Sequence, residues 1–403
     1  MNLKKALYEY EKDLSYYFIF GLLLTWLMAI QFKSAPYQVA TVIILLMGIL
    51  SLSKHHLFLS EKKILSFGLL LPIIIGITTL YNWNTLTQEE LISIAKFLLR
   101  GGLLIIALYA LCSQFSITSA DLIKAFTAIL FISLLVQLTL WLYDGMPTGR
   151  INGLIGNRNQ LALFAVTLSL LSMGGLLSMQ FTSSKLGKTL LFSALTVSLL
   201  VTYYTYSRIA YLSLLIGLAY LLIVRFKIKG LFLLVLISIF FGSFALKNDS
   251  TFRSKFNRSL NISTSDARTT KIWPHTFNKA TEKSLIFGNG YGKAAEEKLK
   301  PSPFYRTVGQ FPYHSVPLEL LYISGLTGLI AFYSLMMAGI KKLHSHVKHA
   351  EASAFIGVLT GGLAEHSLYQ SKPYISLIVV FLVVTLLSIK EDSLKAPHAN
   401  HSV

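Results

Sequence analysis

The sequence from Lys247 to His314 reads KNDSTFRSKFNRSLNISTSDARTTKIWPHTFNKATEKSLIFGNGYGKAAEEKLKPSPFYRTVGQFPYH. It is the only long hydrophilic stretch of the chain, and basic residues clearly outnumber acidic ones in it. Apolar runs of about 17–22 residues lie on both sides, each long enough to cross a hydrocarbon core of about 30 Å as a helix. The stretch, called the insert below, is therefore predicted to separate two groups of membrane-spanning helices.

The composition is typical of a membrane protein. Of the 403 residues, 54% are hydrophobic and 13% are charged, whereas charged residues make up about a quarter of soluble domains. The predicted fold is an all-α polytopic membrane protein in which residues 1–403 form a single membrane domain. About twelve spans are expected, at 15–32, 36–52, 64–81, 91–112, 122–143, 159–180, 189–206, 209–226, 230–246, 315–340, 352–370 and 373–389. Helices 1–9 would occupy 15–246, the insert 247–314, and helices 10–12 residues 315–389.

Basic residues in the short loops predict the orientation. On one side these loops hold many lysines and arginines, and on the other side they hold few. Because cytoplasmic loops are enriched in Lys and Arg, both termini are expected in the cytoplasm, with the insert outside, which in a bacterium is the periplasm. The net charge of +18 does not indicate nucleic-acid binding, because the basic residues are scattered and no nucleic-acid-binding motif occurs. Membrane lipids are the expected surroundings.

Three arginines outside the insert are also expected on the outer side. Arg150 and Arg158 lie between spans five and six, and Arg208 lies in the short turn between spans seven and eight. Arginine presents a planar fork of donors that matches phosphate, so together with Arg268 these residues could bind a pyrophosphate. Alternatively they extend to lipid headgroups or pair with carboxylates such as Asp144. Short exported loops are normally poor in basic residues, which favours phosphate binding.

His314 is the candidate general acid or base. It lies next to Tyr313 at the start of span ten, and an imidazole titrates near neutrality. The alternative is an interfacial histidine that bonds to a loop carbonyl. Ionisable residues inside spans are further functional candidates: Lys96 and Arg100 lie in span four, at i and i+4 on one helix face, and Glu319 lies in span ten.

Several motifs are absent from the sequence. It contains no Asp-x-Asp, no His/Cys/Asp cluster with metal-ligand spacing and no Walker loop. No metal or cofactor is therefore expected. A sugar donor activated by a lipid pyrophosphate needs neither, because its leaving group is good and arginines can stabilise the developing charge. A transporter would also use intramembrane ionisable residues, but the sequence shows neither internal symmetry nor paired Gly/Pro interruptions of its spans.

Four motifs, in this order, resemble the bacterial O-antigen ligase/polymerase superfamily of membrane glycan transferases over roughly residues 145–340. They are Asn157-Arg158-Asn159-Gln160-Leu161-Ala162, Tyr206-Ser207-Arg208, Arg268 followed by Trp273 and the turn 287–292, and Tyr313-His314-Ser315. Two positions depart from the family pattern. Ser315 follows the histidine where the family often has Asn, and Arg158 replaces the middle residue of an Asn-Pro-Asn-like run.

The resemblance implies a twelve-helix, glycosyltransferase-C-like fold and a metal-independent reaction at the periplasmic face of the inner membrane. The donor would be a glycan on undecaprenyl pyrophosphate, and the acceptor a sugar hydroxyl of lipid A–core. Arg208 and Arg268 would bind the pyrophosphate, and His314 would be catalytic. The resulting hypothesis is an inverting O-antigen ligase. The alternatives are an O-antigen or capsule polymerase that uses the same donor and, from a different class, a polysaccharide or lipid transporter.

Overall fold

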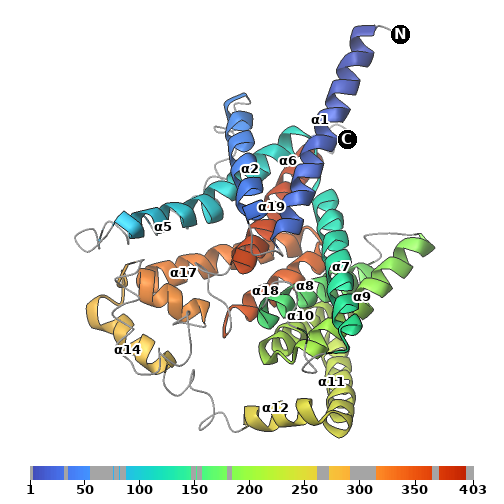
Figure 1. Cartoon of the computed structure of the whole chain (residues 1–403), viewed down its shortest axis with the longest axis vertical. Helices are drawn as coiled ribbons and strands as arrows, with labels where there is room; N and C mark the ends of the chain where they lie inside the picture. The colour runs from blue at the N-terminus through green and yellow to red at the C-terminus, as the bar shows by residue number, and fades with distance from the viewer. Residues whose placement is uncertain are drawn as a thin grey trace, which may run out of the picture.

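The computed structural model describes residues 3–30, 35–54, 76, 81, 88–146, 151, 157–178, 184–260, 272–290, 315–364 and 372–395. Within these ranges every regular element is a helix, which confirms the predicted all-α polytopic fold (Figure 1). Seven of the described helices are long and apolar enough to cross a membrane, and three shorter apolar helical stretches add to them. The expected span 64–81 lies outside the described residues except for Gly76 and Tyr81.

The helices follow the hydropathy pattern closely. Before the insert they are α1 (Leu3–Ala29), α2 (Ala35–Lys54), α5 (Gln88–Leu98), the π-helical turn η2 (Leu99–Leu103), α6 (Leu104–Gln114), α7 (Ser119–Tyr143), α8 (Arg158–Ser178), α9 (Lys185–Thr205), α10 (Arg208–Phe226) and α11 (Ile228–Asn248). The insert contributes α12 (Ser250–Leu260) and α14 (Trp273–Lys283), and after it come α17 (Val316–Ser345), α18 (His349–Gly361) and α19 (Lys372–Lys395). Expected span four is thus a continuous helical stretch made of α5, η2 and α6.

The centre of the bundle is formed by helices that approach one another closely. α19 is the most deeply buried candidate span, with 89% of its apolar window buried, and α11 is the least, with 17%. Small residues allow the contacts, because a Cβ on Gly174 of α8 would lie 2.4 Å from the Cβ of Ala350 of α18. Buried hydroxyls add hydrogen bonds between helices, such as Ser353 Oγ donating to the Gly217 carbonyl at 2.8 Å. Small residues and hydrogen bonds of this kind are what hold helices together in lipid.

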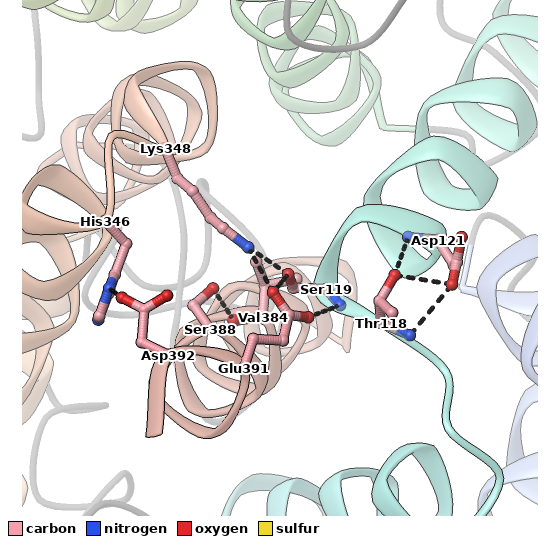
Figure 2. Close-up of polar contacts among 9 residues, drawn as sticks. All are labelled: Thr118, Ser119, Asp121, His346, Lys348, Val384, Ser388, Glu391 and Asp392. Carbon is pink, nitrogen blue, oxygen red and sulfur yellow. Dashed lines mark hydrogen bonds and ion pairs between the residues drawn. The ribbon is translucent and has the colours of Figure 1, made fainter. Parts of the chain in front are cut away.

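A polar cluster joins α7, the α17–α18 turn and α19 at one end of the bundle (Figure 2). Glu391 accepts from the backbone amide of Ser119 at 2.6 Å and from its hydroxyl at 2.8 Å. Lys348 forms an ion pair with Glu391 at 3.2 Å, and His346 contacts Asp392. The carboxylate of Glu391 therefore accepts a hydrogen bond from the amide at the start of α7 while it pairs with Lys348, the N-cap residue of α18.

We expect Glu391→Ala to lower the free energy of unfolding by about 1–3 kcal/mol, because the buried Ser119 amide would lose its acceptor. Thermal unfolding of the purified protein in detergent measures the effect. Glu282→Ala is the matched control, since Glu282 is exposed and pairs with Lys279 in the same helix; exposed pairs contribute about 0–1 kcal/mol. Equal losses in the two variants would contradict a role of the cluster in joining the helices.

α17 is not a continuous helix. It is broken at Gly325, which has φ 66° and ψ −163°. The break frees backbone groups on both sides, and a segment of the insert bonds with them. The four backbone hydrogen bonds are Asn289 N to Tyr322 O (2.7 Å), Gly290 N to Ile323 O (3.0 Å), Leu326 N to Leu285 O (2.8 Å) and Thr327 N to Ile286 O (3.2 Å). The insert is thus docked onto a span through its main chain.

Glycine is required on both sides of this contact. A Cβ on Gly325 would lie 2.2 Å from the Ile286 carbonyl oxygen, and a Cβ on Gly288 would lie 2.6 Å from the Gly325 nitrogen. Gly288 and Gly290 also have positive φ values of 71° and 86°, a region that glycine adopts without steric cost. The span expected at 315–340 is therefore interrupted at Gly325. Broken helices in transporters present open backbone groups to ions, whereas these groups bond with the insert.

Candidate functional site

Arg208 is held at the tip of the α9–α10 hairpin. The chain turns at Tyr206, which has left-handed φ 48° and ψ 36°, and Ser207 is the N-cap of α10. Arg208 is the first residue of α10 and is half-buried, whereas Tyr206 and Ser207 are buried. Because the turn is so short, the position of the Arg208 backbone is set by the packing of Tyr206 and its neighbours.

Asp249 links this tip to the start of the insert. It lies between α11 and α12, and its Oδ2 accepts from the Tyr203 hydroxyl at 2.6 Å and from the Tyr206 hydroxyl at 2.8 Å. Its Oδ1 accepts from the Phe252 amide at 2.9 Å, which caps α12. Burial alone would raise the pKa of Asp249, but these hydrogen bonds outweigh it and lower the pKa. The carboxylate is therefore ionised at neutral pH and accepts all three bonds.

Aromatic rings surround the same tip. Phe252 of α12 stacks on Tyr203, with ring centroids 6.2 Å apart, and also contacts Tyr211. The Tyr211 hydroxyl donates to the Tyr203 carbonyl at 2.8 Å. Trp141, near the end of α7, packs against Tyr204 with centroids 4.8 Å apart. Side chains from α7, α10 and α12 thus fix the end of α9, and with it the residue that starts α10.

Arg158 occupies on α8 the same position that Arg208 occupies on α10, since it is the first residue of its helix. The Asn157 side chain caps α8 by accepting from the Asn159 amide at 3.0 Å. α8 and α10 run in the same direction, because α9 connects them and turns back between them. Leu170, twelve residues into α8, meets Gly217, nine residues into α10. The two helices therefore begin at the same end of the bundle, and so do their arginines.

The loop that carries Arg150 reaches this end as well. Ile151 is buried, and its amide donates to the Tyr204 carbonyl at 3.2 Å, just before the hairpin tip. Arg150 itself lies outside the described residues, as do Arg268, Tyr313 and His314. For His314 the structure describes the residue that follows, because Ser315 is buried and is the N-cap of α17. The Val316 amide donates to the Gly362 carbonyl at the end of α18 at 2.8 Å.

The supporting candidates lie in two different helices. Glu319, in the first turn of α17, is 1% exposed and is close enough to the Tyr374 hydroxyl of α19 to act on it electrostatically. Lys96 belongs to α5, and its side chain is outside the described part. Arg100 belongs to the π-helical turn η2 and lies near Tyr37. The Lys96–Arg100 pair therefore spans the junction between α5 and the π-helical turn.

Some residues of this region carried no recognised signal in the sequence. Asp249 is one, because its partners Tyr203 and Tyr206 lie more than forty residues earlier in the chain. The tyrosines directly before Arg208 are the sequence feature that could have indicated a buried polar partner at this turn. His275 of α14 is expected from its place in the middle of the insert to be a surface residue. In the structure it is half-buried, and its Nε2 is buried without a hydrogen-bond partner in the described part of the chain. It is a second imidazole to test beside His314.

The hairpin tip, the insert and the break in α17 all lie within a segment that is similar to a known protein family. Residues 192–333 match the family model described as O-Antigen ligase. Over these residues the chain is similar to the O-antigen ligase family. The matched O-antigen ligase segment contains Arg208, Asp249 and Gly325. Comparison with curated proteins gives no match.

The similarity to the O-antigen ligase family, together with the apolar helices, supports a membrane enzyme of glycan transfer of the ligase or polymerase type. The site region is consistent with that chemistry. Two described arginines begin parallel helices at one end of the bundle, where helix N-termini favour anions. The contacts around Tyr203 and Asp249 hold one of these arginines in place.

Proposed function

We propose that the protein is an O-antigen ligase. It transfers a glycan from undecaprenyl pyrophosphate to a sugar hydroxyl of lipid A–core at the periplasmic face of the bacterial inner membrane. The observation that carries the proposal is the position of Arg208 within the family-matched segment, as the first residue of α10 at the end of the bundle where Arg158 begins α8. Both termini lie in the cytoplasm, and the insert (247–314) lies in the periplasm between helices 1–9 (15–246) and helices 10–12 (315–389).

The pyrophosphate of the donor binds to arginines. Arg208 and Arg268 are its main ligands, with Arg150 and Arg158 beside them. Guanidinium groups bind phosphate oxygens in pairs and stay charged at any relevant pH. The amides at the start of α8 and α10 add positive electrostatic potential at the same end of the bundle. This arrangement stabilises negative charge as it develops on the leaving group.

Transfer is a single displacement. His314 takes the proton from the acceptor hydroxyl as the hydroxyl oxygen attacks the anomeric carbon. The bond from that carbon to the pyrophosphate oxygen breaks, and its electron pair leaves with the lipid pyrophosphate. Attack opposite the leaving group inverts the anomeric configuration, and the step uses no metal or cofactor. Tyr313, Glu319, Lys96 and Arg100 are candidates for supporting roles.

The test is glycan attachment in cells that lack their own ligase. The chain is expected to restore a ladder of glycan on lipid A–core. A polymerase would instead lengthen glycan that remains on the lipid carrier, because its acceptor is a second carrier-linked glycan. A product that keeps the anomeric configuration of the donor would rule out the single displacement.

His314→Ala is expected to reduce transfer by about 10²–10⁴-fold, because the acceptor hydroxyl would lose its general base. In the same cells, at matched expression, glycan should accumulate on the carrier and the lipid A–core ladder should disappear. His275→Ala is the matched control and should keep the ladder. Loss of the ladder with His275→Ala, but not with His314→Ala, would move the catalytic role to α14.

A further inference from the structure

The described residues of the insert form two amphipathic helices of equal length, and the two differ in what covers them. α14 packs against α17, and its Thr276 and Ala280 are fully buried. α12 carries Phe252 and Phe256 four residues apart on one face. Phe252 is half-buried against the hairpin tip, but Phe256 is 41% exposed. The described part of the chain leaves this outer half of the apolar face uncovered.

The connection to α11 sets the depth of α12 relative to the membrane. α11 is the candidate span with the smallest buried share, and near its end Phe240, Phe241 and Phe244 are 68%, 63% and 61% exposed. Aromatic side chains this exposed on an apolar span face lipid. Asp249 alone separates the end of α11 from the start of α12. α12 therefore begins where α11 leaves the hydrocarbon, and it runs across the end of α11 (Figure 1).

Contacts of the first turn of α12 fix the rotation of the helix about its own axis. The Asp249 carboxylate caps the Phe252 amide, and the Phe252 ring packs on Tyr203 of α9. Arg253 donates to the carbonyls of Leu246 and Lys247 at 2.7 and 2.8 Å, which closes the end of α11. The face that carries Phe252 is thus turned toward the spans. Phe256 lies on that same face, one turn further along α12.

The charges of α12 suit a bilayer surface. From Ser250 to Leu260 the sequence contains Arg253, Lys255 and Arg258 and no acidic residue. Ser254 and Asn257, on other faces of the helix, are exposed and polar. A narrow apolar stripe beside a polar face that carries several basic residues is typical of helices that lie in the headgroup layer. Anionic headgroups attract each nearby Lys or Arg.

We infer that α12 is an interfacial helix that lies in the headgroup layer of the membrane. Phe256 inserts into the acyl boundary, and the basic residues bind anionic lipid headgroups. Because Asp249 joins α12 to Tyr203 and Tyr206, the helix also sets the depth of the hairpin tip relative to the membrane surface. The inference rests on the exposure, spacing and charge of α12 and does not depend on the proposed reaction.

Spin labelling of the full-length protein tests the inference. Cys112 is the single cysteine, so a Cys112→Ala background allows one nitroxide at Phe256→Cys or, as the matched control on the polar side, at Ser254→Cys. The proteins are placed in nanodiscs of phosphatidylethanolamine and phosphatidylglycerol. The ratio of collision rates with oxygen and with a water-soluble nickel chelate is expected to be several-fold higher at 256 than at 254. Replacing phosphatidylglycerol with phosphatidylcholine should lower the ratio at 256.

Three results would overturn the inference in different ways. Equal ratios at 256 and 254 would place α12 in water. Spin–spin coupling between labels at 256 on two molecules would identify a second copy of the chain as the partner. An unchanged ratio in phosphatidylcholine would show that the basic residues do not bind anionic headgroups. If Phe256→Cys is not monodisperse, Phe256→Trp with bromolipid quenching, compared with the same protein without that tryptophan, gives the same readout.

Discussion

Gly325→Ala is expected to accumulate poorly and to lose glycan transfer. The backbone at this position, with φ 66° and ψ −163°, lies in a region that is essentially restricted to glycine. The added Cβ would lie 2.2 Å from the Ile286 carbonyl oxygen, so the segment of the insert that bonds with α17 must move away. Strain and lost backbone hydrogen bonds together should cost on the order of 4 kcal/mol. Thermal unfolding in detergent and the lipid A–core ladder measure the two effects.

Gly242→Ala is the matched control for this substitution. Gly242 lies in the regular helix α11, and an added Cβ there meets nothing within 4 Å. Alanine has the higher helix propensity, so this variant should unfold at or slightly above the wild-type temperature. If Gly325→Ala behaved like Gly242→Ala, the docking of the insert onto the break would not be needed for folding or transfer.

Arg208→Ala is expected to lower the rate of transfer by about 10²–10³-fold, because the pyrophosphate would lose a charged ligand in the transition state. Arg208 is half-buried at the start of α10, so the folded protein should persist. Arg208→Lys should give an intermediate rate, since lysine keeps the charge but not the planar fork of donors. Purified protein with a lipid-linked donor and lipid A–core provides the rates, and unfolding temperatures show that the variants are folded.

Arg225→Ala is the matched control, because Arg225 lies near the other end of the same helix and is exposed. It should transfer glycan at nearly the wild-type rate. A wild-type rate for Arg208→Ala would contradict the pyrophosphate role, although the similarity of residues 192–333 to the family would remain. A drop in the unfolding temperature as large as the drop in rate would indicate a structural role for Arg208 instead.

The sequence alone determined the class of the protein and the course of most helices. The spans expected to begin at residues 159, 209 and 373 begin at Arg158, Arg208 and Lys372. Such boundaries are local, because a helix that crosses lipid must be apolar along its whole length and must hydrogen-bond internally. The position of Arg208 was also determined locally. The turn Tyr206-Ser207 is so short that Arg208 must start α10.

Tertiary structure alone decided how the insert is attached to the bundle. The break at Gly325 exists because Leu285, Ile286, Asn289 and Gly290 bond with the groups that it frees, and no local pattern predicts such a partner. The bonds of Asp249 to Tyr203 and Tyr206 join residues more than forty positions apart. Hydropathy reports whether a segment is stable in lipid, but it carries no information about which polar group another polar group meets. Those pairings depend on the packed arrangement of the helices.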